Sequence, residues 1–404
     1  MLTLFICFFD IFLNSYRLEI ACIYLGLLIV PLVLIKYESQ MIRYSIRPTH
    51  FKRRGSPTNT HGNRAIGLIW GLTVVPVASM TYLVSRFDSL ANYLSQLAIR
   101  PLAFQGLNTF SELAINLVSL LTVIYFGMGL IERRSKRWWA CYSLHCVIAV
   151  TILSLSGSRR YLLMPVIMML ALYHYFRSEI SVKKAGICLL GLLAVTSVVG
   201  VLRMGQRDAN FMERDLNGVE RESVTAHFKY GLVPLEVVFN ASVLNLHYGS
   251  TFVAAFTNFI PRPLWPDKPN AAGIVITQDY LGNRWLGTSY LNAGLLAESV
   301  MNFGFAAGLP FSFVALIVSM IYLVRRYHRA LLMLRRPVRS VHSVFHLVRH
   351  FHIAFAITGL ITWETAIVAI PLVLNLTVIM ILERLMTSWS TGRLTRSLPG
   401  EIGA

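Results

Sequence analysis

The chain is built from repeated apolar runs, most of them close to the roughly 20 residues that cross a bilayer as a helix. Of its 404 residues, 55% are hydrophobic and only 14% are charged. Backbone groups inside a bilayer must satisfy their own hydrogen bonds, which leaves helices or a closed barrel as solutions. The runs are continuous rather than alternating, and this pattern favours helices. We therefore expect an all-α polytopic integral membrane protein.

We expect about ten transmembrane helices, or 11–12 if the moderately apolar segment 231–260 also crosses the membrane. That segment is interrupted by polar residues and a proline, so interfacial or re-entrant helices are the favoured interpretation. In chain order, residues 1–204 hold the N-terminal spans, 205–303 form a large polar loop, and 304–404 hold the C-terminal spans and a tail. The expected spans are 2–15, 19–35, 65–85, 110–131, 138–156, 161–177, 185–204, 304–324, 343–361 and 365–382.

The net charge of +18 lies mainly in short loops beside the spans. The loop 36–64 carries seven Lys or Arg residues against one acid, which places it in the cytoplasm by the positive-inside rule. Alternation from this loop puts 205–303 on the extracytoplasmic face and both termini in the cytoplasm. The charge thus reflects topology, and we expect no nucleic-acid partner. None of the five cysteines forms a CxxC pair, so neither a disulfide framework nor a cysteine zinc site is indicated.

The large loop contains a proline-rich segment, Ile260–Pro269 (IPRPLWPDKP), which we call the strap. Proline fixes φ and removes backbone donors, so the strap should be rigid and non-helical. It presents two cations, Arg262 and Lys268, beside the indole of Trp265. This combination suits an anionic, sugar-like ligand.

Four further arginines are predicted on the extracytoplasmic side, where basic residues are disfavoured. Arg159 and Arg160 lie in the turn SGSRR, and Arg203 and Arg207 lie where the seventh span should emerge. A guanidinium there can bind a phosphate through two hydrogen bonds. The alternatives are a helix-connecting turn with snorkelling arginines, and an ion pair of Arg207 with a neighbouring acid.

Acidic and histidine residues near span ends are further candidates. Glu298, Asn302 and Glu364 lie close to the predicted membrane surface, where a carboxylate can act as a general base or simply bind backbone donors at a helix start. His342, His346 and His350 recur every four residues and share one helix face, with His352 nearby. That spacing can bind zinc, but contact with lipid headgroups is the favoured interpretation, and we assign no metal ligand here.

Three motifs in this order resemble the repeat-unit (O-antigen) polymerases of the Wzy type. They are the SGSR turn, the IPRxLWPDKP strap, and AExxxNFG at residues 297–304. The resemblance implies a metal-independent glycosyltransferase with a GT-C-like fold and no cofactor, working at the outer face of the bacterial inner membrane. Arg159, Arg262 and Lys268 would then bind diphosphate, Trp265 would stack on sugar, and Glu298 would serve as a base.

The implied reaction joins undecaprenyl-diphosphate-linked oligosaccharide repeat units into O-antigen, capsule or exopolysaccharide. The implied partners are the lipid-linked substrate, membrane lipid and a chain-length regulator protein. Two alternatives stay open: a ligase that transfers glycan to lipid A–core, and a flippase or transporter for lipid-linked glycans. A flippase should carry its charges along a central cavity, whereas the polar residues here concentrate in one outer loop.

Overall fold

The computed structural model describes most of the chain between residues 60 and 391, and all regular secondary structure in the described part is helical. The described residues are 60–96, 108–131, 134–156, 159–181, 183–184, 186–188, 191, 232–257, 260, 264–281, 292–334, 341–361 and 363–391. The expected spans 2–15 and 19–35, and nearly all of 185–204, lie outside them.

Five helices in the described part are long and apolar enough to cross a membrane. They are α3 (Thr60–Ser85), α6 (Asn108–Ile131), α7 (Lys136–Leu155), α13 (Gly294–Leu334) and α15 (Thr365–Thr391). A shorter apolar helix, α8 (Arg159–Phe176), matches the expected span 161–177. Helix α14 (Val341–Gly359) forms as expected but is not among the five, because four histidines and an arginine lower its hydropathy. The helices indicate an integral membrane protein.

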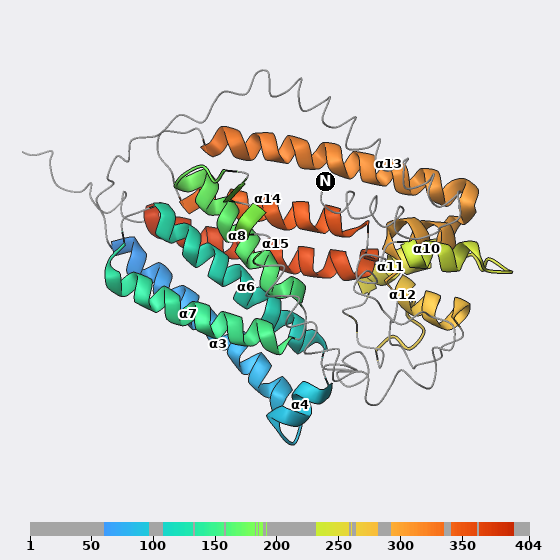
Figure 1. Cartoon of the computed structure of the whole chain (residues 1–404), viewed down its shortest axis with the longest axis horizontal. Helices are drawn as coiled ribbons and strands as arrows, with labels where there is room; N and C mark the ends of the chain where they lie inside the picture. Colours follow the sequence, from blue (N-terminus) through green and yellow to red (C-terminus); the bar gives the residue numbers. More distant parts are fainter. Residues whose placement is uncertain are drawn as a thin grey trace, which may run out of the picture. The chain divides into compact units, whose positions relative to one another are not determined.

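The chain divides into two compact units, whose helices are labelled in Figure 1. One unit comprises residues 50–217, 332–351 and 375–404, and we call it the α6 unit. The other comprises 1–49, 218–331 and 352–374, and we call it the strap unit because it holds the strap. The boundary between the units falls within α14 and within α15, so one end of each helix belongs to the α6 unit and the other end to the strap unit.

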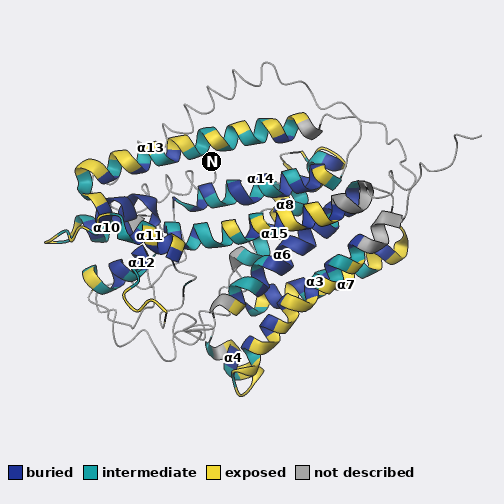
Figure 2. Cartoon of the chain, turned by 180° about the vertical axis from the view of Figure 1, so that it is seen from behind, coloured by how far each residue is buried: buried dark blue, intermediate teal, exposed yellow. Residues whose placement is uncertain are grey.

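Helix α6 is the centre of its unit, with α3, α7 and α8 packed against it. It is buried along most of its length, as its dark colour in Figure 2 shows. Two glycines allow this close packing. A Cβ on Gly127 would lie 2.6 Å from the Val344 side chain of α14, and one on Gly129 would lie 2.6 Å from the Trp138 ring of α7. Small residues let helix backbones approach closely within a membrane, where hydrophobic burial gives no driving force.

A buried histidine joins three helices of the α6 unit. His145 of α7 has no exposed surface, and its Nε2 lies 3.0 Å from the Thr73 hydroxyl of α3. Its Nδ1 lies 3.3 Å from the Thr122 hydroxyl of α6. The ring therefore has a polar partner on each nitrogen, as a buried imidazole requires.

The strap unit contains short helices beside the long ones. They are α10 (Leu232–Phe239), α11 (Ser250–Thr257), α12 (Ala272–Val275) and the π-helical turn η3 (Ile276–Tyr280), all from the part of the chain predicted to form the large loop. An eight-residue helix is about 12 Å long, far short of a bilayer core of about 30 Å. Neither α10 nor α11 is therefore long enough to cross a bilayer core by itself, and the interfacial or re-entrant interpretation of 231–260 stays a prediction. The short helix α4 (Leu90–Gln96) belongs to the other unit.

Helix α13 is broken at Gly304, where φ is +74° and ψ is 175°. Only glycine readily adopts this conformation. Residues 294–302 form a buried first segment, and the chain turns sharply into the long second segment from 305. The two segments touch, since a Cβ on Gly308 would lie 2.4 Å from the Ser299 carbonyl oxygen. The span expected at 304–324 thus corresponds to the second segment.

Candidate functional site

Glu298 lies in the first segment of α13 and has no exposed surface. Its Oε2 accepts hydrogen bonds from both the backbone N–H and the hydroxyl of Thr365, each 2.8 Å long. Its Oε1 accepts a 3.1 Å bond from the Thr251 hydroxyl of α11. Thr365 opens α15, so the carboxylate lies at a helix N-terminus, where the helix dipole favours negative charge. Glu298 therefore fastens α11 and α15 to α13.

Asn302 lies one helical turn after Glu298, just before the break in α13, and its side chain bonds to α11 and to the loop that precedes α11. Its Nδ2 donates to the Thr251 hydroxyl over 2.6 Å and to the Glu298 carbonyl over 2.7 Å. Its Oδ1 accepts a 2.8 Å bond from the N–H of Gly249. The two preceding N–H groups, of His247 and Tyr248, donate to the carbonyls of Met301 and Asn302 at 2.9 and 3.1 Å. The loop before α11 thus supplies backbone donors to two carbonyls that lie just before the break at Gly304.

A second carboxylate, Glu364, precedes α15 and is 2% exposed. It accepts a hydrogen bond from the N–H of Gly273, which lies in the first turn of α12. Burial, and to a lesser extent the nearby Glu298 carboxylate, raise the pKa of the Glu364 carboxyl to about 8, although the hydrogen bond from the Gly273 N–H opposes the rise. At neutral pH this carboxyl therefore favours its protonated, uncharged form.

Small side chains bring these elements together around the two carboxylates. Ala254 and Ala255 of α11, Ala271 before α12, and Ala366 of α15 form one buried cluster. Thr251 and Gly273 therefore mark two fixed points on either side of the strap in sequence. We call this arrangement of Glu298, Glu364 and their partners the carboxylate clamp. It holds both ends of the segment that carries the strap.

The described part of the strap is non-helical and exposed, as its prolines predict. Leu264 is 78% exposed and Trp265 is 38% exposed. The ammonium group of Lys268 donates a 2.8 Å hydrogen bond to the carbonyl of Ile260, which draws the two ends of the strap together. The Lys268 N–H also donates to the Trp265 carbonyl over 3.3 Å. The strap is thus a closed loop with an accessible indole.

The predicted arginines are not assembled into a site by the described residues. Arg262, Arg203 and Arg207 lie outside them. Arg159 and Arg160 open α8 in the α6 unit, and only their backbone is described. The strap, Glu298 and Asn302, in contrast, share one unit, and the clamp links them.

The AExxxNFG motif has a structural explanation at each of its three polar or glycine positions. Glu298 and Asn302 are fully buried and engaged in hydrogen bonds, so in this structure they position other elements and touch no solvent. Gly304 supplies the break. The sequence analysis did not identify Thr251, Gly273 and Thr365 as partners of the two acids. The only sign of them in the sequence is that small and hydroxyl residues occur in the same apolar segments as these acids.

Comparisons with protein-family models, with curated proteins and with solved structures found no match for this chain.

Proposed function

We propose that this chain polymerises lipid-linked oligosaccharide repeat units at the outer face of the bacterial inner membrane. The observation that carries the proposal is the strap, a non-helical loop with an exposed indole whose flanking segments are held by the buried carboxylate clamp. A binding loop on a rigid base keeps its geometry and loses little entropy on binding. Few features of a membrane-spanning bundle other than ligand binding require such a loop.

Exposed apolar residues in the strap unit, one of them in the strap itself, support a lipid-linked substrate. Tyr248, Phe256 and Leu264 are 81%, 69% and 78% exposed. A surface this apolar is unfavourable in water and favourable at the membrane interface. The strap would therefore lie where a polyprenyl-linked sugar meets the bilayer surface.

In the proposed reaction, a hydroxyl of the incoming repeat unit attacks the anomeric carbon of the growing glycan. A new glycosidic bond forms, the bond from that carbon to the undecaprenyl diphosphate breaks, and the proton of the attacking hydroxyl is released with the departing undecaprenyl diphosphate. Arg262 and Lys268 would stabilise the charge that develops on the diphosphate. Trp265 would stack on a sugar ring, and Glu298 would act as a positioning residue through Thr251 and Thr365.

The proposal is tested in a strain that lacks the gene, complemented with the wild-type chain or with variants. Trp265→Ala should reduce the long-chain glycan on a lipopolysaccharide or capsule gel by about tenfold or more, for a lost contact of about 1.4 kcal/mol. Trp139→Ala is a matched control, because that tryptophan is 36% exposed and lies on α7 of the other unit. It should leave the ladder unchanged.

The deletion itself separates the competing activities. A polymerase deletion leaves one repeat unit on the core. Loss of all glycan from the core would instead indicate a ligase, and lipid-linked units trapped inside the cell would indicate a flippase. A normal ladder in the deletion strain would refute all three.

A further inference from the structure

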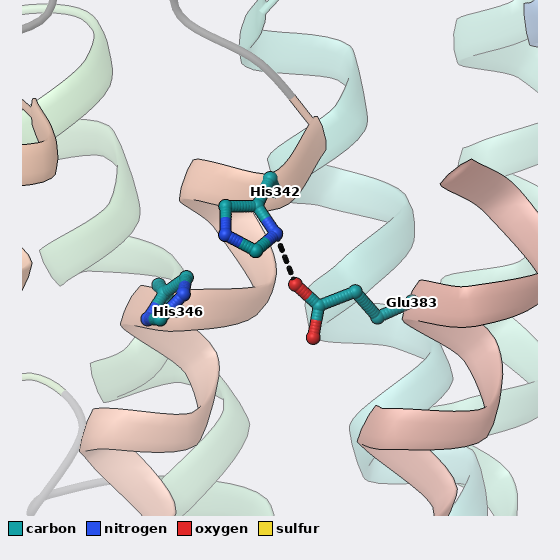
Figure 3. A group of neighbouring side chains, drawn as sticks. All are labelled: His342, His346 and Glu383. Atoms are coloured by element: carbon teal, nitrogen blue, oxygen red, sulfur yellow. Dashed lines mark ion pairs between the residues drawn. The ribbon is translucent and has the colours of Figure 1, made fainter. Parts of the chain in front are cut away.

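A cluster of two histidines and one glutamate joins α14 to α15 within the α6 unit. His342 and His346 lie one turn apart on α14, and Glu383 lies on the adjoining part of α15. One nitrogen of each ring and one carboxylate oxygen all lie within 4.8 Å of one another. Figure 3 shows the Glu383 carboxylate reaching from α15 to His342, with the His346 ring one turn along.

These three groups have the chemistry of a zinc site. Zinc in proteins binds imidazole nitrogen and carboxylate oxygen at about 2.0–2.2 Å, so tetrahedral ligands lie about 3.3–3.5 Å apart. The separations between the ligand atoms of the cluster are at most 4.8 Å, which is close to this spacing. Three protein ligands leave a fourth position for water.

The surroundings of the cluster favour a bound ion over a simple histidine–glutamate ion pair. Arg349 already pairs with Oε2 of Glu383, which fixes the carboxylate and leaves Oε1 directed at His342. A ligand carboxylate held by such an outer partner is typical of metal sites. The two histidine rings are 4.4 Å apart between centroids, so both lie on the side of α14 that Glu383 approaches.

Access and position are also suitable. The His342 side chain is 46% exposed, so an ion and its water ligand can reach the cluster from solvent. We propose that His342, His346 and Glu383 form a Zn²⁺ site that fastens the start of α14 to the second half of α15. The three residues belong to the α6 unit and not to the strap unit, and the inference does not depend on the proposed function.

The test uses the full-length chain, purified in detergent without a polyhistidine tag and stripped of metal with a chelator. Zn²⁺ is titrated against a chromophoric chelator, and Co²⁺ is added separately to obtain a visible absorption spectrum. We expect one tightly bound Zn²⁺ per chain, a tetrahedral Co²⁺ spectrum, and a higher unfolding temperature with Zn²⁺, because a ligand that binds only the folded state stabilises it.

Each of His342→Ala, His346→Ala and Glu383→Gln should weaken Zn²⁺ binding by at least about tenfold, since even outer partners contribute 10–100-fold. His328→Ala, which removes a half-exposed histidine of α13 outside the cluster, is the matched control and should bind like the wild type. Circular dichroism confirms that each variant is folded. Unchanged Zn²⁺ affinity in folded Glu383→Gln and His346→Ala, or no binding by the wild type, would overturn the site.

Discussion

Replacing Glu364 with glutamine should make the protein more stable at alkaline pH. The carboxyl is buried beside Glu298, and its pKa is raised from an ordinary value of 4.5 to about 8. Between these two values the folded chain holds a proton that the unfolded chain has released. The free energy of unfolding therefore falls as the pH rises from about 4.5 to about 8. Glutamine mimics the protonated acid and removes this dependence.

The size of the effect follows from the two pKa values. At about 1.4 kcal/mol per pH unit, the wild type loses up to about 5 kcal/mol across the interval. Glutamine keeps an oxygen that can accept the Gly273 hydrogen bond, so the variant should match the wild type near pH 5. Above pH 8 its unfolding temperature should be higher by about 10 °C or less, at about 2 °C per kcal/mol for a large chain.

Thermal unfolding in detergent from pH 5 to pH 9, followed by gel filtration of the surviving folded protein, measures this directly. Glu179→Gln, an exposed residue that follows α8, is the control and should keep the wild-type pH profile. Parallel profiles for the wild type and Glu364→Gln would refute the assignment of a raised pKa to this carboxyl.

Three further substitutions test the packing that supports the site. Gly304→Ala should lower the free energy of unfolding by about 1–3 kcal/mol through backbone strain alone, since the nearest atom to a Cβ there is 3.8 Å away. The control is Gly71→Ala on α3, where a Cβ meets nothing within 4 Å, and it should be neutral or stabilising. Equal effects of the two substitutions would contradict the break. Thr365→Val should lower the free energy of unfolding by about 1–3 kcal/mol because it removes one hydrogen-bond donor to Glu298, whereas Thr365→Ser keeps that donor and should not. Equal melting temperatures for these two variants would argue against the clamp. Gly127→Ala should lower the free energy of unfolding by about 1–3 kcal/mol by overpacking against Val344, and adding Val344→Ala should recover part of that loss. If stability is not recovered, this contact is not the cause of the loss.

The long apolar helices were predictable because hydrophobicity over a whole span determines them. The predicted segments 65–85, 110–131 and 138–156 agree with α3, α6 and α7 to within a few residues. Helix α13 begins ten residues before the predicted span, because the buried first segment and its break at Gly304 depend on tertiary contacts. A glycine in an apolar run gives no sign that its φ is positive.

The site was predictable only in part, for the same reason. The strap was recognisable from its prolines, and Glu298 and Asn302 stood out as polar residues beside a span. Their partners were not recognisable, since Thr365 lies 67 residues from Glu298 and Gly273 lies 91 residues from Glu364. Glu383 likewise could be paired with the histidine stripe only after α14 and α15 were placed side by side.

The central claim is that this chain joins lipid-linked repeat units, and the purified protein tests it most directly. The full-length chain is reconstituted in liposomes with a defined undecaprenyl-diphosphate-linked repeat unit, and products are measured by mass spectrometry. The account predicts glycans of two or more repeat units, with one undecaprenyl diphosphate released for each bond formed, and a loss of both products in Arg262→Ala. Unreacted substrate with folded wild-type protein, or full-length product from Arg262→Ala, would contradict it.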